Sequence, residues 1–259
     1  MIAIYEPKGM AREYAELACN LYSGCAHGCL YCYAPACLHR HRDSFHFNVR
    51  PRDGIVEALR RQAPKYAGIK KRVLLSFTSD PYQPAEEREG LTRQALEILV
   101  EHHIPFQVLT KGGVRAVRDF DLLETADGWL ATTLIFTEEA SRVEWEPNAA
   151  PLQSRTEAIQ EAHCRGIRTW VSVEPVIDPM QALELIERLN PWVDGWKVGK
   201  LNHHPAAREV DWHDFATQVS VMLERSGKEY LIKESLQPYL PTCGAAVIPV
   251  LCKQPRLPL

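Results

Sequence analysis

Three cysteines that lie close together near the start of the chain are the residues best suited to chemistry. In the segment NLYSGCAHGCLYCYA, Cys25, Cys29 and Cys32 have the spacing C-x3-C-x2-C, and Gly24 and Gly28 are interleaved with them. Three thiolates in a short loop that contains glycine can converge on one inorganic centre. Structural zinc takes four ligands, and bacterial ferredoxin clusters use C-x2-C-x2-C with a distant fourth cysteine. Three ligands leave one metal position open, and an open iron of a [4Fe–4S] cluster can be chelated by a small molecule.

The other cysteines have plainer interpretations. Eight cysteines in 259 residues are fewer than a small disulfide scaffold contains, which favours metal binding or catalysis for the clustered ones. Cys37 and His39 offer an alternative in which they complete a zinc site with the three upstream cysteines. Cys164 lies in a segment with helical spacing of apolar residues and is expected in the core. Cys243 and Cys252 lie in a proline-rich tail, either as ordinary thiols or as hydrogen donors to a radical.

Composition and charge exclude several classes of protein. Hydrophobic residues make up 46% and charged residues 24% of the chain, which is average for globular proteins and excludes disordered and fibrous classes. No window approaches 18 consecutive apolar residues, and the first residues lack the pattern of a signal peptide. We therefore expect a cytoplasmic protein that does not associate with membranes. The net charge of −3 indicates no global field, so any argument from charge must be local.

From residue 72 onward, short apolar runs alternate with segments of helical pattern. Strands are expected at residues 72–78, 105–111, 128–134, 167–173, 192–198 and 229–233. Helices are expected at residues 91–102, 114–124, 152–165, 179–189 and 212–225. This alternation predicts a parallel sheet with right-handed crossovers, and six or seven such units without a dinucleotide fingerprint favour a full or partial barrel. We expect one domain over residues 1–240 and a proline-rich tail over 241–259.

The cysteine loop, residues 24–33, resembles the hallmark loop of the radical S-adenosylmethionine (SAM) superfamily, in which an aromatic residue, here Tyr31, precedes the last cysteine. The resemblance extends to spore photoproduct lyase and the related DNA-repair-photolyase-like proteins over roughly residues 18–200. The segments that carry it are GCAHGCLYCYA, SFTSDPYQPAE, LTRQALEIL, VLTKGG, RDFDLL, WEPNAAPLQSR and GIRTWVSVEPVI. It implies an α/β fold, the partial (β/α)6 barrel that this superfamily shares.

The resemblance also implies the cofactors and their ligands. Cys25, Cys29 and Cys32 would bind a [4Fe–4S] cluster, and Tyr31 would lie along the adenine of SAM. The cluster would receive its electron from a donor such as flavodoxin or ferredoxin.

Further cofactor contacts are implied at the ends of predicted strands, where barrel sites form. Ser79 is similar to the serine that contacts the methionyl amino group, and Lys111 to the lysine that pairs with the methionyl carboxylate. Thr133 stands where the family often has a residue that contacts ribose or methionine. Asp80 and Glu174 complete the expected cofactor set. Taken alone, the segments at 79–81 and 111–113 would also suit turns or helix starts, and Glu174, like Glu146 also followed by proline, would also suit a solvated turn.

One position departs from the lyase. The lyase has a cysteine that returns a hydrogen atom to the substrate radical, and the corresponding position here resembles Phe77, which cannot donate hydrogen. Tyr33 matches a tyrosine of the lyase, and Tyr33 and Cys37 are therefore the candidate catalytic residues. Cys243 and Cys252 are further candidates for the hydrogen donor.

The stretch of residues 39–72 is locally basic. It contains ten Lys or Arg against three acidic residues, interleaved with Phe45 and Phe47. Such a strip is typical of contacts to phosphates with stacking platforms nearby, and it is equally typical of a solvated helix face with a covering loop. A nucleic-acid partner is therefore one of two interpretations.

These features lead to three hypotheses about function. The first is a radical SAM enzyme that abstracts hydrogen from a nucleic-acid base, in repair or modification. The second is a radical SAM enzyme that modifies a peptide or a small metabolite. The third is a nucleic-acid-binding module without catalysis, in which Cys25, Cys29, Cys32 and Cys37 hold zinc.

Overall fold

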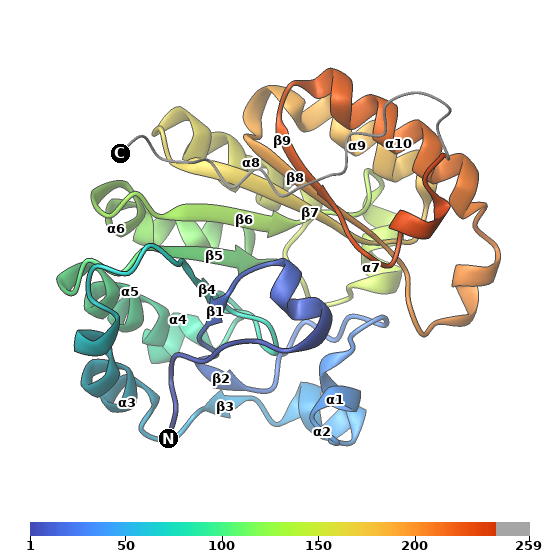
Figure 1. The fold of residues 1–259 in the computed structure, drawn as a ribbon. Helices are drawn as coiled ribbons and strands as arrows, with labels where there is room; N and C mark the ends of the chain where they lie inside the picture. The colour runs from blue at the N-terminus through green and yellow to red at the C-terminus, as the bar shows by residue number, and fades with distance from the viewer. Residues whose placement is uncertain (242–259) are drawn as a thin grey trace.

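The computed structural model describes residues 1–241, and within them a parallel sheet curves into a half-barrel with helices along its outer face (Figure 1). Neighbouring strands follow one another in the order β1-β4-β5-β6-β7-β8-β9, and every pair is parallel. Their bounds are β1 (Leu17–Ala18), β4 (Val73–Leu75), β5 (Phe106–Thr110), β6 (Trp129–Thr133), β7 (Arg168–Val176), β8 (Gly195–Lys200) and β9 (Glu229–Ile232). The partial-barrel fold class expected from the sequence is confirmed.

The helices that connect the strands are α3 (Ile55–Gln62), α5 (Leu91–Glu101), α6 (Phe120–Thr125), α8 (Leu152–Cys164), α9 (Pro179–Leu189) and α10 (Trp212–Ser226). Among them, α5, α8, α9 and α10 follow the predicted bounds closely. Shorter helices are α1 (Ala34–Cys37), α2 (Arg42–Phe47), α4 (Glu86–Glu89) and α7 (Glu139–Trp145). The helix expected at 114–124 is divided into the 3-10 helix η3 (Gly113–Asp119) and α6, and α3 was missed.

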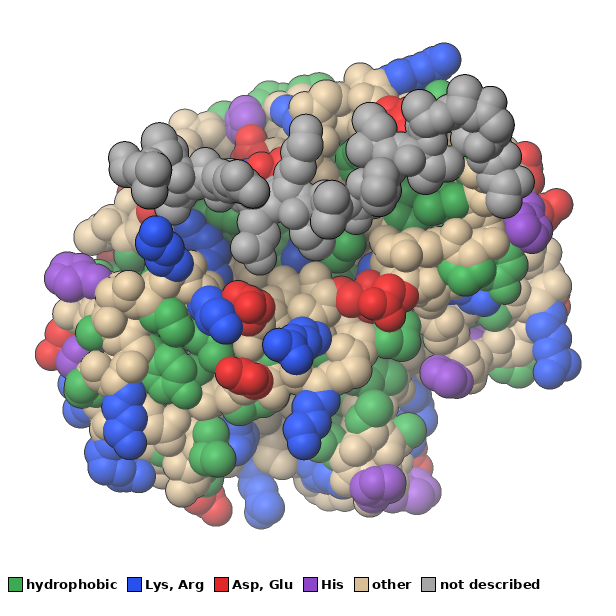
Figure 2. Space-filling model, viewed as in Figure 1, with side chains coloured by type: hydrophobic (Ala, Val, Ile, Leu, Met, Phe, Trp, Pro, Cys, Tyr) green, Lys and Arg blue, Asp and Glu red, His purple; other side chains and the backbone are tan. Residues whose placement is uncertain are grey.

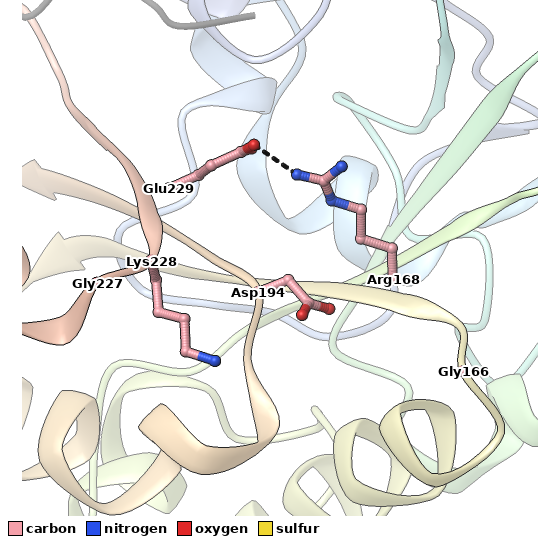
Figure 3. A pocket seen from close by; sticks show the side chains of 6 residues that line it. All are labelled: Gly166, Arg168, Asp194, Gly227, Lys228 and Glu229. Atoms are coloured by element: carbon pink, nitrogen blue, oxygen red, sulfur yellow. Dashed lines mark ion pairs between the residues drawn. The ribbon is translucent and has the colours of Figure 1, made fainter. Parts of the chain in front are cut away.

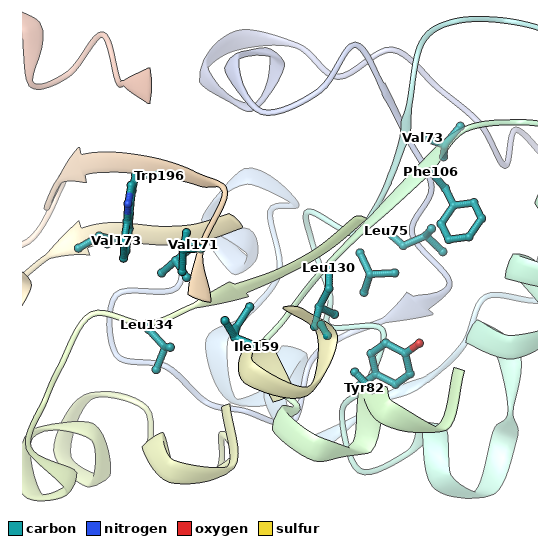
Figure 4. Close-up of a cluster of buried hydrophobic side chains, with 14 of the residues drawn as sticks. Val73, Leu75, Tyr82, Phe106, Leu130, Leu134, Ile159, Val171, Val173 and Trp196 are labelled. Atoms are coloured by element: carbon teal, nitrogen blue, oxygen red, sulfur yellow. The ribbon is translucent and has the colours of Figure 1, made fainter. Parts of the chain in front are cut away.

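The core lies between the sheet and these helices, because strands buried on both faces must be covered by apolar side chains. Figure 4 shows Leu130 beside Ile159 of α8, with Val171 and Phe106 of neighbouring strands in the same buried cluster. The expectation that Cys164 lies in this core is wrong. Cys164 is exposed at the last turn of α8, where helical periodicity turns it away from the buried face of that helix.

The first strand of the sheet was also missed. β1 is two residues long and pairs with β4 through Leu17 and Ala18, and so short a run carries no alternation to recognise. After it, β2 (Tyr22–Ser23) pairs with β3 (Arg50–Pro51) in a small antiparallel sheet. The cysteine loop therefore begins where the chain leaves the carboxyl end of the barrel's first strand.

The inner face of the half-barrel is filled by the N-terminal segment, which crosses in front of the sheet in Figure 1. Tyr14 is buried against Leu74, Ala131 and Trp170, and its hydroxyl hydrogen-bonds Ser172 at 2.7 Å. Side chains of both charges gather around the hollow on this face (Figure 2). The interior of the half-barrel is thus packed around Tyr14.

A shallow pocket of about 410 Å³ lies at the opposite edge (Figure 3). Its lining includes Arg168, Asp194 and Glu229, each at or just before the start of a strand, and Arg168 pairs with Glu229 at 2.7 Å. This pocket shares no residue with the predicted site. No helix among residues 1–241 is long and apolar enough to cross a membrane. The predicted tail, with Cys243 and Cys252, lies outside the described residues except for its first residue.

Candidate cluster and cofactor site

The cysteine loop is held by hydrogen bonds to the Gln83 side chain and to the backbone of Trp145. The Ala26 amide donates to Gln83 Oε1 at 2.8 Å, and Gln83 Nε2 donates to the Gly24 carbonyl at 3.3 Å. The Leu30 amide donates to the carbonyl of Trp145 at 2.8 Å. A loop that satisfies its backbone groups through outside partners keeps a fixed shape without regular secondary structure. The loop is therefore preorganised to present its cysteines.

Two carbonyls next to the cysteine thiols accept from basic side chains of α2. His46 Nδ1 hydrogen-bonds the Cys25 carbonyl at 2.8 Å, and Arg42 donates to the Cys29 carbonyl. Gly24 has φ +95°, and a Cβ there would stand 2.5 Å from the carbonyl oxygen of Phe45. Only glycine therefore allows the loop to approach α2 this closely.

The three thiols act on one another electrostatically. The pKa of Cys25 is raised well above its usual value by burial, then by Asp80 and by Cys29 and Cys32. Burial raises the pKa of Cys29 to about 12, while the ammonium of Lys111 lowers it, and Lys111 acts in the same sense on Cys32. Three thiols that act on one another electrostatically, two of them beside a lysine, are compatible with an iron–sulfur cluster, which is bound by thiolates. Within residues 1–241, no three Cys, His, Asp or Glu side chains are arranged to hold a single metal ion.

Asp80 joins the cysteine loop to the strand ends. One carboxylate oxygen accepts from Thr110 Oγ1 at 2.6 Å and from the Tyr82 amide at 2.8 Å. The other accepts from the Lys111 amide at 2.6 Å and pairs with His27 Nε2 at 3.1 Å. Burial opposes ionisation of Asp80, but His27, Thr110 and the Lys111 amide together hold its pKa well below the usual value. Both oxygens are thus engaged by the protein itself, and His27 is buried inside the loop as an orienting residue.

Replacing Asp80 by asparagine is expected to lower the free energy of unfolding at pH 7 by about 1–3 kcal/mol, because buried donors lose a charged acceptor. An unfolded aspartate has a pKa of about 3.9, and that of folded Asp80 is lower. Its contribution is therefore complete above about pH 5 and is lost as pH falls below about 4. Urea unfolding of both proteins should show a difference that shrinks on acidification. The exposed substitution Asp53→Asn is the control, and an equal difference at pH 3 and pH 7 would contradict the assignment.

A buried ion pair between Glu146 and Arg155 contacts Tyr31 of the loop. The Tyr31 hydroxyl donates a hydrogen bond to Oε1 of Glu146. Arg155 Nη1 forms an ion pair with Oε2 of Glu146 at 2.6 Å. The side chains of Glu146 and Arg155 are fully buried. Burial opposes ionisation of Glu146, but Arg155 and then Lys111 hold its pKa below the usual value. The Lys111 ammonium lies 5.6 Å from the centre of the Tyr31 ring.

Lys111 is the cation that faces the thiols. Burial alone would lower its pKa, but the negative groups of Cys29 and Glu146 raise it above the usual value. Lys111 follows the last residue of β5, Ser79 follows β4 and Thr133 ends β6. Since parallel strands end at one edge of the sheet, the structure brings these three predicted residues to the same edge as the cysteine loop.

Glu174 lies in a different group on β7. It accepts from the Tyr14 hydroxyl and pairs with Lys233 at 3.1 Å, and Lys233 is itself buried. The structure therefore places Glu174 among residues of the inner face of the barrel. It is not a solvated turn carboxylate.

Tyr33 and Cys37, the candidate catalytic residues, lie on the outer side of the loop. Tyr33 is 48% exposed, and its hydroxyl donates to the carbonyl of Phe77 at 3.0 Å. Cys37 is exposed at the end of α1. Tyr33 is thus in direct contact with Phe77, the residue expected from the sequence at the position of the lyase cysteine.

Several residues of the site escaped sequence reasoning. Arg155 and Gln83 reach the site from positions far along the chain. For Glu146 the sequence predicts only a loop or strand-end carboxylate. The segment WEPNAAPLQSR carries a signal for this pair, because an arginine nine positions after a glutamate in an otherwise uncharged segment can be its buried partner.

The basic strip at 39–72 divides in two. Arg42 contacts the cysteine loop at the carboxyl edge of the sheet, whereas Arg72 immediately precedes β4 and pairs with Asp127 at 2.7 Å near the start of β6. Lys71 pairs with Glu16 at 3.2 Å. The two ends of the strip therefore lie at opposite edges of the sheet and do not form one continuous basic face.

Comparison with curated proteins gives distant relatives. No family model matches the sequence. The chain is 25% identical over 174 residues to an uncharacterized protein of Methanocaldococcus jannaschii, covering 66% of this chain and 64% of the relative. It is 28% identical over 167 residues to an uncharacterized protein of Mycobacterium tuberculosis, covering 61% and 48%. The chain thus spans between about half and just under two thirds of the length of these relatives.

Solved structures resemble the chain over most of its length. A spore photoproduct lyase variant with bound AdoMet and dinucleoside spore photoproduct matches with a TM-score of 0.65 and 15% identity, covering 87% of this chain and 78% of the lyase. Streptococcus suis SuiB bound to S-adenosylmethionine matches with a TM-score of 0.62 and 12% identity, covering 86% and 52%. Since both share the course of the backbone with this chain, the protein has the partial-barrel fold of the radical SAM enzymes, of the type found in spore photoproduct lyase.

Proposed function

We propose that this protein is a radical SAM enzyme whose [4Fe–4S] cluster is bound by Cys25, Cys29 and Cys32. When bound, such a cluster supplies the electron that cleaves SAM to methionine and a 5′-deoxyadenosyl radical, which abstracts hydrogen from a substrate. The observation that carries the proposal is that Cys25, Cys29 and Cys32 lie on one short loop at the carboxyl edge of the half-barrel, near enough to act on one another electrostatically, with Lys111 acting on Cys29 and Cys32.

The chain's own residues would bind and orient SAM. Lys111 would pair with the methionyl carboxylate, Ser79 would contact the methionyl amino group, and Thr133 would contact ribose or methionine. Tyr31 would lie along the adenine, with its ring held in place because its hydroxyl bonds the buried Glu146. Asp80 has no free carboxylate oxygen for SAM, so we assign it the positioning of the loop.

We propose a nucleic-acid base as the substrate. A spore photoproduct lyase of similar fold carries a dinucleoside spore photoproduct in its structure. Glu174 and Lys233 lie on the inner face of the barrel, where they would meet the substrate. Because Phe77 replaces the lyase cysteine, we assign Tyr33 and Cys37 as the candidate hydrogen donors.

The test is to purify the protein without oxygen, reconstitute it with iron and sulfide, and add SAM and dithionite. Formation of 5′-deoxyadenosine, measured by chromatography, is the expected result. A protein that holds zinc, or a cluster that never cleaves SAM, would refute the proposal. If cleavage occurs, adding damaged or intact oligonucleotides tests the substrate class through their products.

Replacing Lys111 by methionine is expected to weaken SAM binding at least tenfold, because a hydrogen bond between two charged groups contributes about 1.5–3 kcal/mol. Equilibrium dialysis of SAM against the reconstituted protein measures this, and iron content checks that the cluster is retained. The exposed substitution Lys65→Met is the matched control. Unchanged affinity at unchanged iron content would remove Lys111 from the SAM site.

A further inference from the structure

A small basic and apolar surface covers the outside of the cysteine loop. Residues 34–50 contain three arginines and one aspartate in a chain whose net charge is −3. Phe47 is 81% exposed, Leu30 is 47% exposed and Leu38 is 44% exposed. We call this surface the α1–α2 patch, and define it by Leu30, Leu38, Arg40, Arg42, Phe47 and Arg50. The two helices that carry most of it project at the lower right of Figure 1.

The α1–α2 patch is joined directly to the cysteine backbone. Arg42 donates to the carbonyls of Gly28 and Cys29, and Leu30 is itself a residue of the loop. His46, on the same helix as Phe47, hydrogen-bonds the carbonyl of Cys25. A molecule bound on the patch would therefore lie on residues that contact the cysteine loop directly.

An exposed phenylalanine in a short segment that also carries the exposed Arg50 and the partly exposed Arg40 and Arg42 suits an interface with an acidic protein. Exposed aromatic side chains with arginines are enriched where proteins meet, and complementary charge accelerates association. A nucleic acid needs a longer basic track, but the basic residues beyond position 52 lead away from this edge. Among them, Arg60 pairs with Glu101 at 3.6 Å, and Arg72 pairs with Asp127 at 2.7 Å.

We propose that the α1–α2 patch docks an acidic protein that donates single electrons to the cluster. The inference rests on the proposed function, because reductive cleavage of SAM consumes one electron per event. One electron leaves the donor, which is oxidised, and enters the cluster, which is reduced, and no covalent bond changes. Electron transfer slows steeply with distance, so the donor must bind where the cysteine loop lies close to the surface. The interfaces of electron-transfer complexes are small and weak, and the α1–α2 patch is defined by only six residues.

The test compares the reconstituted holoenzyme with a Phe47→Ser/Arg50→Glu double variant. Neither side chain holds the cysteine loop. Binding of purified flavodoxin, an acidic flavin protein, is measured by biolayer interferometry at low and high salt. Formation of 5′-deoxyadenosine is then measured with reduced flavodoxin and, separately, with dithionite. Arg61→Glu, an exposed residue on α3, makes the same charge change away from the patch.

We expect the double variant to bind flavodoxin at least tenfold more weakly and to lose a similar factor in the flavodoxin-driven rate. The dithionite-driven rate should remain that of the wild type, and Arg61→Glu should change neither. Binding by the wild type should weaken as salt increases. The proposal is overturned if the variant binds flavodoxin normally, or if the wild type does not bind it. It is also overturned if the variant loses only oligonucleotide binding, since the patch would then serve nucleic acid.

The two proposals fail in different ways. If dithionite yields no 5′-deoxyadenosine with any form of the protein, the proposed function fails, and the binding measurement still reports on the patch. If dithionite yields product while flavodoxin neither binds nor drives the reaction, only the docking proposal fails.

Discussion

Replacing Cys32 by alanine is expected to reduce the formation of 5′-deoxyadenosine to the level of a reaction without protein. In a [4Fe–4S] cluster with one open iron, three cysteines bind the other three irons. Removing one cysteine therefore removes a ligand and disrupts the cluster site. Cys32 interacts electrostatically with Lys111 and Cys29, so this substitution removes a thiol from the proposed cluster site. Iron bound after anaerobic reconstitution should fall from about four atoms per chain to well below that number.

Cys164→Ala provides the matched control for Cys32→Ala. Cys164 is exposed at the end of α8 and distant in sequence from the loop. This variant should keep the iron content and the rate of the wild type. Full activity of Cys32→Ala would contradict the ligand assignment, and equal losses in both variants would point to a general sensitivity to thiol removal.

Replacing Arg155 by methionine is expected to lower the free energy of unfolding by about 3–5 kcal/mol, because it leaves Glu146 as an uncompensated buried charge. Arg155 also donates to the carbonyls of Ala150 and Thr133, at 2.8 Å and 3.0 Å. Urea unfolding of the metal-free protein measures the change without a contribution from the cluster. A loss below about 1 kcal/mol would show that Glu146 is solvated or protonated in the folded protein.

The control for Arg155 lies on the same helix. Arg165 sits at the end of α8, where its guanidinium pairs with the partly exposed Glu161, so Arg165→Met should cost at most about 1 kcal/mol. A double variant, Glu146→Gln/Arg155→Met, removes both charges. We expect it to be less destabilised than the sum of the single variants, because neither charge is then left unpaired.

The cysteine loop and the alternation of strands and helices could be predicted because both are local. Ligand spacing is encoded within eight residues, and the periodicity of an amphipathic helix is encoded within its own length. The bounds expected for the helix at 179–189 match α9 exactly. By contrast, β1 was missed because a two-residue strand is recognisable only through its pairing with β4.

The sequence by itself thus determined the three-cysteine motif, the fold class and the strand ends at which Ser79, Lys111 and Thr133 lie. Only the tertiary structure decided what the charged residues do. Asp80 is occupied by His27 and Thr110, and Glu146 is buried between Tyr31 and Arg155. The physical reason is that the energy of a charge depends on its burial and its partners, and these come from distant positions. Tyr31 and Glu146, for example, are 115 residues apart.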